Sequence, residues 1–311
     1  MKPEILLVEP IMKPFDERLE ADYAVHRLYE PAEKAKIDAA LPNIRGVVTG
    51  GGNGLSNEWI EKLPNLRVIS VNGVGTDRID LAFARSRNID VAITAGVLTD
   101  DVADLGISLM LASLRHVAKG DAFVRKGLWG KDPFPLGTSP KGKKLGILGL
   151  GQIGRAFGQR AEAFGMSVRY WNRSPVKDTN WTSCESPLAL AQDSDVLCVI
   201  IAATAETKNI VNAEILKALG PKGIIINIAR GTVIDEDALL AALNDGTIGG
   251  AGLDVFVGEP NIRKEFFTAP NTVLMPHQGS ATLETRMAMG ELVLSNLAAH
   301  FAGRTPPTTV N

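Results

Sequence analysis

Short apolar runs alternate with amphipathic segments almost from one end of the chain to the other, and this alternation constrains the fold more than any other feature. Strands of four to seven residues separated by helical segments are typical of βαβ units, which form a parallel sheet covered by helices on both faces. The first series predicts strands at 5–8, 24–28, 46–49, 67–71 and 90–94, with helices near 14–21, 32–41, 56–63 and 79–87.

A second βα series follows a long helix and a connection rich in Gly, Pro and Lys. The helix is expected from 102 to about 118 with Thr99 or Asp100 as its N-cap, and the connection covers 126–144. The later segments predict strands at 144–150, 167–171, 195–201, 223–228, 250–255 and 272–275, then a helix at 281–302. We therefore predict an α/β protein with two Rossmann-like, doubly wound parallel-sheet units.

Length and composition agree with a globular enzyme of two domains. The 311 residues exceed the roughly 150 that one domain usually holds, and a net charge of −2 gives no reason to expect nucleic acid or an anionic membrane as partner. The longest apolar run, 196–203, is too short to span a bilayer, and the N-terminus does not read as a secretion signal. Cys198 lies in that run and reads as a buried thiol, Cys184 and Cys198 lack metal-ligand spacing, and we expect a cytoplasmic protein without a metal site.

A glycine-rich turn opens the second series. Gly149, Gly151 and Gly154 stand in GxGxxG spacing directly after an apolar strand and at the start of a helix. In a dinucleotide-binding site these glycines provide a tight turn, room for the pyrophosphate and close helix–strand packing, and the helix N-terminus faces the phosphates. Because the required strand, turn, helix and second strand are all present, we predict a dinucleotide site here rather than a packing turn.

The segment after the next strand selects between cofactors. Asn172, Arg173 and Ser174 lie where an Asp or Glu usually holds the ribose 2′-hydroxyl of NAD, and no acid occurs between Glu162 and Asp178. Arg173 offers a charge-assisted contact for a 2′-phosphate, with Asn172 and Ser174 as further donors. We predict that NADP is preferred and NAD is bound less well; the alternative is that Arg173 is a surface charge.

Four polar residues follow strands of the second series or lie in the loops after them. Ligands of open α/β sheets bind at the carboxyl ends of the strands, so we expect these side chains near the glycine turn. They are Arg230, Asp254, Glu259 and His277. Their chemistry suits reduction of a ketone beside a carboxylate, with His277 as proton donor, Glu259 stabilising its protonated form, and Arg230 holding the carboxylate or the ketone oxygen. Asp254 would contact the nicotinamide amide or support its neighbours.

Each of these residues also has a purely structural alternative. His277 could be a structural histidine, Arg230 and Glu259 could form a structural ion pair, and Asp254 could cap a turn. If the site were absent, all four residues would have to be structural and would follow strands of one sheet only by coincidence. We therefore retain the catalytic interpretation.

Two small-residue loops of the first series are candidates for substrate contacts. Val74 and Gly75 lie in a turn after an apolar strand whose backbone N–H groups could hold a carboxylate, and Gly51 lies in the loop TGGGNG after another strand. Either loop could instead be a simple tight turn. Trp129, in the Gly/Pro-rich connection, anchors that loop or contacts substrate, and Arg286 and Arg78 read as surface charges.

Taken in order, six segments resemble the D-isomer-specific 2-hydroxyacid dehydrogenase family over nearly the whole chain. They are GVGTDRID, GVLTDDVADL, GKKLGILGLGQIG, NIARG, GLDVF with GEP, and PHQGSAT. The segment WNRS is similar to NADPH-preferring members of the glyoxylate/hydroxypyruvate reductase branch. The loop IAATAET, 201–207, departs from many relatives by lacking a proline.

The resemblance implies a dinucleotide-binding domain at 98–282 inserted into a discontinuous, flavodoxin-like substrate domain at 1–97 and 283–311. It implies a catalytic set of Arg230, Glu259 and His277, with Val74 and Gly75 on the substrate carboxylate. It also implies a homodimer that packs through the long helix and an arm at 119–144, from which Trp129 reaches the partner's active site. We expect the remaining cofactor contacts from Thr99, Gln152, Ile153, Ala202, Thr207, Ile228, Ala229, Arg230, Asp254, His277 and Gly279.

The resulting prediction is an NADPH-dependent reductase of small 2-keto acids, glyoxylate or hydroxypyruvate, that yields the D-2-hydroxy acid. A first alternative keeps the family and changes the substrate to phosphoglycerate, phosphite or an aryl-keto acid. A second alternative is a cofactor-sensing interaction protein, as in the corepressor branch of the family.

Overall fold

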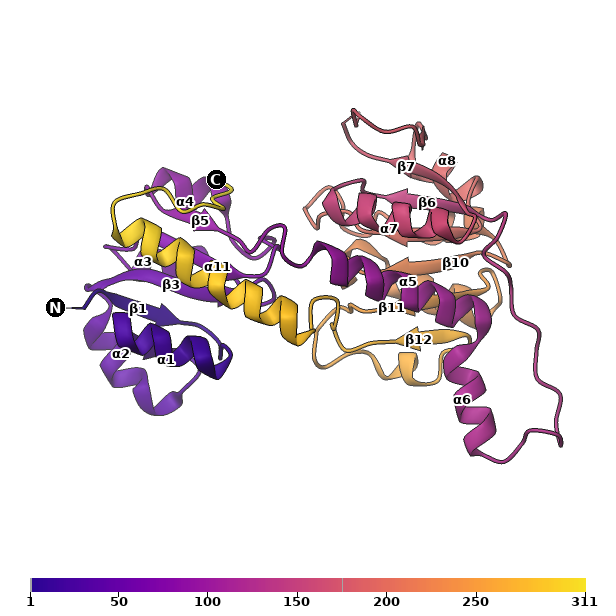
Figure 1. Cartoon of the computed structure of the whole chain (residues 1–311), viewed down its shortest axis with the longest axis horizontal. Coiled ribbons are helices and arrows are strands. Elements are labelled where there is room, and N and C mark those ends of the chain that lie inside the picture. The colour runs from indigo at the N-terminus through magenta and orange to yellow at the C-terminus, as the bar shows by residue number, and fades with distance from the viewer. Residues whose placement is uncertain (1, 175) are drawn as a thin grey trace. The chain divides into compact units, whose positions relative to one another are not determined.

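The computed structural model describes residues 2–174 and 176–311, and the chain divides into two compact units (Figure 1). Unit 1 comprises Met1–Leu98 and Ala281–Asn311, and unit 2 comprises Thr99–Ser280. Each unit holds one parallel sheet, so the prediction of two doubly wound α/β units is confirmed.

Unit 1 is a five-stranded parallel sheet with the strand order β2-β1-β3-β4-β5. This is the flavodoxin-like order, in which the chain reverses direction between β1 and β3 and leaves a crevice at their carboxyl ends. The strands are β1 (Glu4–Leu7), β2 (Ala24–Arg27), β3 (Ile44–Gly50), β4 (Val68–Asn72) and β5 (Asp90–Ala92). The helices are α1 (Lys13–Asp22), η1 (Pro31–Glu33), α2 (Lys34–Ala40), α3 (Asn57–Lys62), α4 (Leu81–Ser86) and α11 (Leu283–Phe301).

Alternation along the strands of unit 1 supplies one apolar cluster on each face of the sheet. Ile5 and Leu7 of β1 pack with α1 and α11, whereas Leu6 between them packs with α2 and α3. Successive side chains of a strand point to opposite faces, so a strand covered on both sides is apolar throughout. Both faces are therefore closed by helices, and the loops at the ends of the strands remain available for ligands.

Unit 2 is a seven-stranded parallel sheet with the order β12-β11-β10-β9-β6-β7-β8. Numbered within the unit, its first six strands follow the Rossmann order, with the switch point between β6 and β9. The strands are β6 (Lys144–Leu148), β7 (Ser167–Trp171), β8 (Thr182–Ser183), β9 (Val196–Val199), β10 (Ile224–Asn227), β11 (Gly250–Leu253) and β12 (Thr272–Leu274). The helices are α5 (Thr99–Arg115), α6 (Val117–Arg125), α7 (Gln152–Ala163), α8 (Pro187–Gln192), α9 (Ala213–Leu219), η2 (Gly231–Val233), α10 (Glu236–Asn244) and η3 (Lys264–Phe267).

Helices cover both faces of this second sheet. α5 and α7 pack together on one face, while α8, α9 and α10 enclose a large apolar cluster on the other. Gly106 permits the close approach of α5, because a methyl group there would lie 2.8 Å from both Ile228 and Phe157. Cys198 is fully buried in β9, as predicted, and burial raises the pKa of its thiol well above the usual value.

Two expectations about the long helix were wrong. α5 begins at Thr99, so neither Thr99 nor Asp100 is its N-cap, and it ends at Arg115 instead of near 118. His116 adopts a left-handed conformation with φ of 54°, which breaks the helix before α6 begins. The sequence analysis also missed the two-residue strand β8 and placed several strand ends one or two residues too late.

α6 and the segment after it extend away from the sheet of unit 2 (Figure 1). Five large apolar side chains of this region are exposed, including Trp129 at 80% and Leu136 at 95%. The others are Val117, Val124 and Phe134. No helix of residues 2–174 and 176–311 is long and apolar enough to cross a membrane.

Candidate active site

The glycine-rich turn has the geometry that a dinucleotide requires. Gly149 has φ of +104°, and a side chain on it would collide with the backbone of Ile201. A Cβ on Gly154 would lie 2.6 Å from the carbonyl oxygen of Gly149, so the helix and the turn are in close contact. In contrast, the space at Gly151 is open for 4 Å, and no side chain caps the N-terminus of α7 there. The turn therefore leaves room and backbone donors for a pyrophosphate.

The side chain of Asn172 forms hydrogen bonds with the backbone of the glycine turn. Its side-chain oxygen accepts a hydrogen bond of 2.6 Å from the backbone N–H of Leu150, and its amide nitrogen donates to the carbonyl of Leu150 at 3.4 Å. These bonds link the end of β7 to the glycine turn, and the role of Asn172 as a phosphate donor stays a prediction. Arg173 and Ser174 follow with exposed side chains at the position expected for the ribose.

The loop at 201–207 folds largely on its own hydrogen bonds. The hydroxyl of Thr207 donates to the carbonyl of Ala202 at 2.7 Å and accepts from the backbone N–H of Thr204 at 2.8 Å. A hydrogen bond from Thr204 chiefly lowers the pKa of Glu206, and the charge of Arg173 contributes to the same direction. Arg173 therefore acts on a carboxylate of this loop, which the sequence did not indicate.

His277 and Glu259 form the pair that the sequence predicted. Nδ1 of His277 lies 2.6 Å from Oε2 of Glu259, and the other carboxylate oxygen accepts from the backbone N–H of Phe256 at 2.7 Å. Burial alone would raise the pKa of Glu259, but these hydrogen bonds and the charges of His277 and Arg230 outweigh it, and the pKa is lowered. The carboxylate is therefore charged and holds one ring nitrogen of His277, which leaves Nε2 for a ligand.

Asp254 fixes the loop that carries His277. The side chain is 2% exposed and accepts hydrogen bonds from the backbone N–H groups of Gln278 at 2.6 Å and Gly279 at 2.9 Å. Its own carbonyl accepts from the N–H of His277 at 2.9 Å. His277 has φ of 55°, an uncommon backbone conformation that these three bonds hold in place. Asp254 therefore caps this turn, which is the structural alternative considered in the sequence analysis. Gly279 supplies one of the backbone N–H donors to its carboxylate.

Arg230 follows β10 in the loop that precedes η2. Its guanidinium donates to the carbonyl of Ala229 at 2.8 Å, and its backbone carbonyl accepts from the side chain of the buried Asn227 at 3.0 Å. Ile228 and Ala229 are buried beneath it. Arg230, Glu259 and His277 thus belong to loops that follow neighbouring strands β10, β11 and β12.

The two small-residue loops of unit 1 lie together at the carboxyl ends of β3 and β4. A Cβ on Gly73 would be 3.3 Å from the backbone nitrogen of Gly51, so the loops touch. Val74 and Gly75 follow at once and are half-buried. Trp129 lies in the exposed arm of unit 2, and its contact with substrate stays a prediction.

Two residues at the same edge of unit 1, Glu9 and Asn53, were not singled out by the sequence analysis. Glu9 follows β1 and accepts a hydrogen bond from the side chain of Asn53, in the loop after β3. Burial chiefly raises the pKa of Glu9, opposed by Asn53 and by the charge of Arg286. Arg286 is half-buried near the start of α11, so the interpretation as a simple surface charge was wrong. Glu9 could have been found by applying the strand-end rule to β1.

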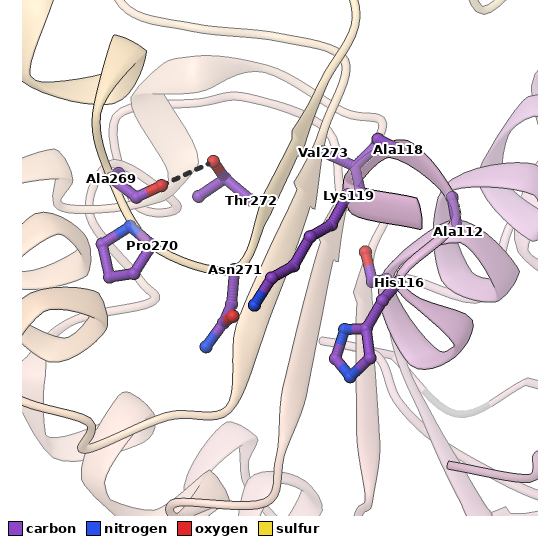
Figure 2. Close-up of a pocket in the computed structure, with 10 residues that line it drawn as sticks. Ala112, His116, Ala118, Lys119, Ala269, Pro270, Asn271, Thr272 and Val273 are labelled. Carbon is purple, nitrogen blue, oxygen red and sulfur yellow. Dashed lines mark hydrogen bonds between the residues drawn. The ribbon is translucent and has the colours of Figure 1, made fainter. Parts of the chain in front are cut away.

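A cavity of about 340 Å³ lies elsewhere in unit 2 (Figure 2). Lys119 of α6 and Asn271, just before β12, reach into it, and His116 lines its far side. Residues that precede β12 belong to the amino ends of the strands, opposite the loops described above. This cavity is therefore separate from the glycine turn and from His277.

A parallel sheet in Rossmann order, an uncapped glycine turn and a histidine–carboxylate pair define a nucleotide-dependent oxidoreductase. Residues 107–279 match the family model for the NAD-binding domain of D-isomer specific 2-hydroxyacid dehydrogenases. The chain belongs to the D-isomer specific 2-hydroxyacid dehydrogenase family and is an NAD(P)-dependent enzyme, as predicted.

Close relatives act on different substrates according to their names. The chain is 50% identical over 310 residues to a 2-ketogluconate reductase of Gluconobacter oxydans (strain 621H), covering 99% of each chain. It is 43% identical over 301 residues to a hydroxyphenylpyruvate reductase of Plectranthus scutellarioides, covering 96% of each. The crystal structure of an NADPH-dependent glyoxylate/hydroxypyruvate reductase from Sinorhizobium meliloti, in complex with NADP and malonate, superposes with a TM-score of 0.93 at 39% identity. That match covers 100% of this chain and 97% of the other.

Proposed function

We propose that the protein reduces small 2-keto acids, glyoxylate or hydroxypyruvate, to D-2-hydroxy acids with NADPH. The observation that carries this proposal is the pairing of His277 with Glu259 at 2.6 Å, on loops that follow the strands of a dinucleotide-binding sheet. A charged carboxylate beside the ring stabilises the imidazolium, which is the form that can protonate a developing alkoxide.

Each residue of the site has a distinct role in the proposed reduction. A dinucleotide held at the glycine turn would supply a hydride to the carbonyl carbon of the substrate. Nε2 of His277 donates a proton to the carbonyl oxygen, and Glu259 retains the positive charge on the ring until that transfer. Arg230 orients the carboxylate and the carbonyl through its fork of N–H groups. Asp254 is a positioning residue, because it holds the backbone on both sides of His277.

A preference for NADP is supported by Arg173. It is exposed just past β7, with no acid in the segment where an NAD-binding chain carries one. The related structure from Sinorhizobium meliloti binds NADP. Two of the remaining predicted contacts, Gln152 and Ile153, lie in the first turn of α7. No side chain caps this helix, so its first backbone N–H groups are available to a ligand. We assign Thr207 and Asn172 to shaping this site from within, as their hydrogen bonds indicate.

We further propose that Gly51, Val74 and Gly75 of unit 1 contact the substrate, and that unit 2 holds the cofactor. The exposed apolar side chains at 117–136 favour a homodimer formed through this arm, because apolar groups of this size gathered on a surface mark an interaction site. Whether Trp129 then reaches the partner's site, and whether the enzyme is cytoplasmic, stay predictions.

An assay with both cofactors tests the activity directly. Oxidation of NADPH and NADH is followed with glyoxylate, hydroxypyruvate, 2-ketogluconate and phenylpyruvate, and the configuration of the product is determined. We expect turnover with NADPH and the short 2-keto acids, and a loss of about 10²–10⁴-fold in kcat for His277→Ala with cofactor binding intact. Turnover of phenylpyruvate alone would favour the aryl-keto acid alternative. No turnover with any 2-keto acid would favour a cofactor-sensing protein.

A further inference from the structure

The carboxyl edge of the sheet in unit 1 carries an acidic group, Glu9, that forms no ion pair among the described residues. Glu9 is half-buried at the end of β1, and its carboxylate lies directly over Gly50, where a methyl group would have no room. Within residues 2–174 and 176–311, no Lys, Arg or His nitrogen lies within ion-pair distance of Glu9. Carboxylates that serve the fold are normally paired when they are removed from water, whereas this one is held only by the amide of Asn53.

The position of Glu9 places it among the predicted substrate contacts. β1, β3 and β4 are neighbours in the sheet, and their carboxyl ends carry Glu9, the Gly51 loop and the Val74 loop in that order. Gly50 pairs with Asn72 in the strand register. The side-chain oxygen of Asn72 is buried and accepts no hydrogen bond in the part of the chain that the structure describes. Two acceptor groups, a carboxylate and an amide oxygen, therefore lie at one edge with too few donors.

Hydroxyl groups satisfy such acceptors. A carboxylate accepts strongly from hydroxyls, and it repels a second carboxylate or a phosphate. A metal ion is a poor alternative, since no group of three His, Cys, Asp or Glu side chains in the described residues could hold one. Burial raises the pKa of Glu9, and the hydrogen bond from Asn53 and the charge of Arg286 oppose that rise in part.

We propose that Glu9 and Asn53 select 2-keto acids whose chain beyond the carbonyl carries hydroxyl groups, and reject those that carry a second acid. This inference rests on the proposed 2-keto acid reductase activity and names its substrate class. Hydroxypyruvate and longer polyhydroxy 2-keto acids are accepted, whereas oxaloacetate and phosphorylated 2-keto acids are disfavoured.

Hydroxypyruvate and pyruvate provide the test, because they differ by one hydroxyl group. The ratio of kcat/KM for hydroxypyruvate over pyruvate is measured with NADPH for wild type, Glu9→Gln and Asn53→Ala. Glutamine keeps the size of the side chain and an acceptor for Asn53, but it loses the charge. We expect the ratio to fall about tenfold in Glu9→Gln and by a smaller factor in Asn53→Ala. The ratio for oxaloacetate over pyruvate should rise severalfold in Glu9→Gln, as repulsion is removed.

A matched control comes from the same strand. Glu4 lies at the opposite end of β1 and bonds His26 at 2.8 Å, so Glu4→Gln should leave both ratios as in wild type. Asn53 is exposed in a loop, and its replacement keeps the test valid even if Glu9→Gln folds poorly. Unchanged ratios in an active Asn53→Ala and Glu9→Gln would overturn this inference alone. A wild-type enzyme inactive with every 2-keto acid would overturn the proposed function and this inference with it.

Discussion

Replacing Glu259 by glutamine removes the charge beside His277 while changing little else. Glutamine retains the length of the side chain and an oxygen that can accept from the backbone N–H of Phe256, which bonds Glu259 at 2.7 Å. It loses the charge-assisted hydrogen bond to Nδ1 of His277 at 2.6 Å. We expect Glu259→Gln to fold and bind cofactor, and to protonate the substrate less effectively at neutral and alkaline pH.

The size of the effect follows from the exposure of the pair. A hydrogen bond to a charged group contributes about 1.5–3 kcal/mol. The side chains of His277 and Glu259 are 43% and 31% exposed, so water screens the interaction and the lower value of about 1.5 kcal/mol applies. This energy corresponds to about tenfold in kcat/KM. Reduction at neutral and alkaline pH should lose about that factor, since it requires the protonated ring.

The pH range separates this effect from titration of the carboxyl itself. The pKa of Glu259 lies below its usual value of 4.5, so the carboxylate is charged throughout an assay from about pH 5 to pH 9. A lowered pKa means that the pair stabilises the folded state above pH 4.5 and that this contribution is lost as pH falls through the lowered value. The loss of kcat/KM over this range therefore reports the lost charge and not a titrating Glu259.

The assay follows kcat/KM for hydroxypyruvate reduction and hydroxy acid oxidation across this range. Because the equilibrium constant is fixed at each pH and cofactor binding is unchanged, oxidation should lose kcat/KM by the same factor as reduction in Glu259→Gln. Glu236→Gln is the control. Glu236 is half-buried near Glu259, but its carboxylate accepts a hydrogen bond from the backbone N–H of Val257 at 2.8 Å and not from His277. Wild-type kcat/KM for reduction in Glu259→Gln across this range, or an equal loss in Glu236→Gln, would refute the reasoning.

Three further variants test other parts of the site. Arg173→Asp should raise KM for NADPH by about 30–100-fold and change KM for NADH by no more than about threefold, because only NADPH carries a 2′-phosphate. Equal effects on both would show that Arg173 is a surface charge without a role in cofactor selection. Asp254→Asn leaves a buried N–H group of the His277 turn without an acceptor, which costs about 1–3 kcal/mol and lowers Tm by roughly 2–10 °C in calorimetry, with a lower kcat. Gly154→Ala brings a methyl group within 2.6 Å of the Gly149 carbonyl, so titration should show cofactor affinity reduced on the order of tenfold; wild-type affinity would show that the turn can relax.

Much of the fold could be predicted because the parallel sheets impose their pattern on each strand. A strand such as β10 (Ile224–Asn227) is buried on both faces, so its apolar run is unbroken and easily recognised. The break at His116 could not be found in this way, because a left-handed residue between two helices leaves the apolar periodicity almost intact. β8 was missed because its two residues, Thr182 and Ser183, are exposed and carry no apolar signal.

The site divides along similar lines. The strand-end rule located His277 and Glu259, because it depends only on where strands stop, and the sequence shows that. It could not decide what Asp254 and Asn172 bind, since both bond backbone groups that lie 22 or more residues away in the sequence. Charged and amide side chains have the same appearance in a sequence whether they face a ligand or hold a loop, and only the folded partners distinguish the two cases.

The two units also differ in what part of a substrate they can recognise. Every 2-keto acid has the same carboxylate and carbonyl group, and Arg230 and His277 of unit 2 have the chemistry for these shared groups. Selection between 2-keto acids must therefore depend on residues suited to the rest of the chain. Glu9 is a group of this kind at the strand ends of unit 1. Its half-buried carboxylate accepts from Asn53 and forms no ion pair with a cation of the described residues. If selection lies there, replacing Glu9 changes which 2-keto acid is preferred, while replacing Glu259 slows the reduction of all of them by a similar factor.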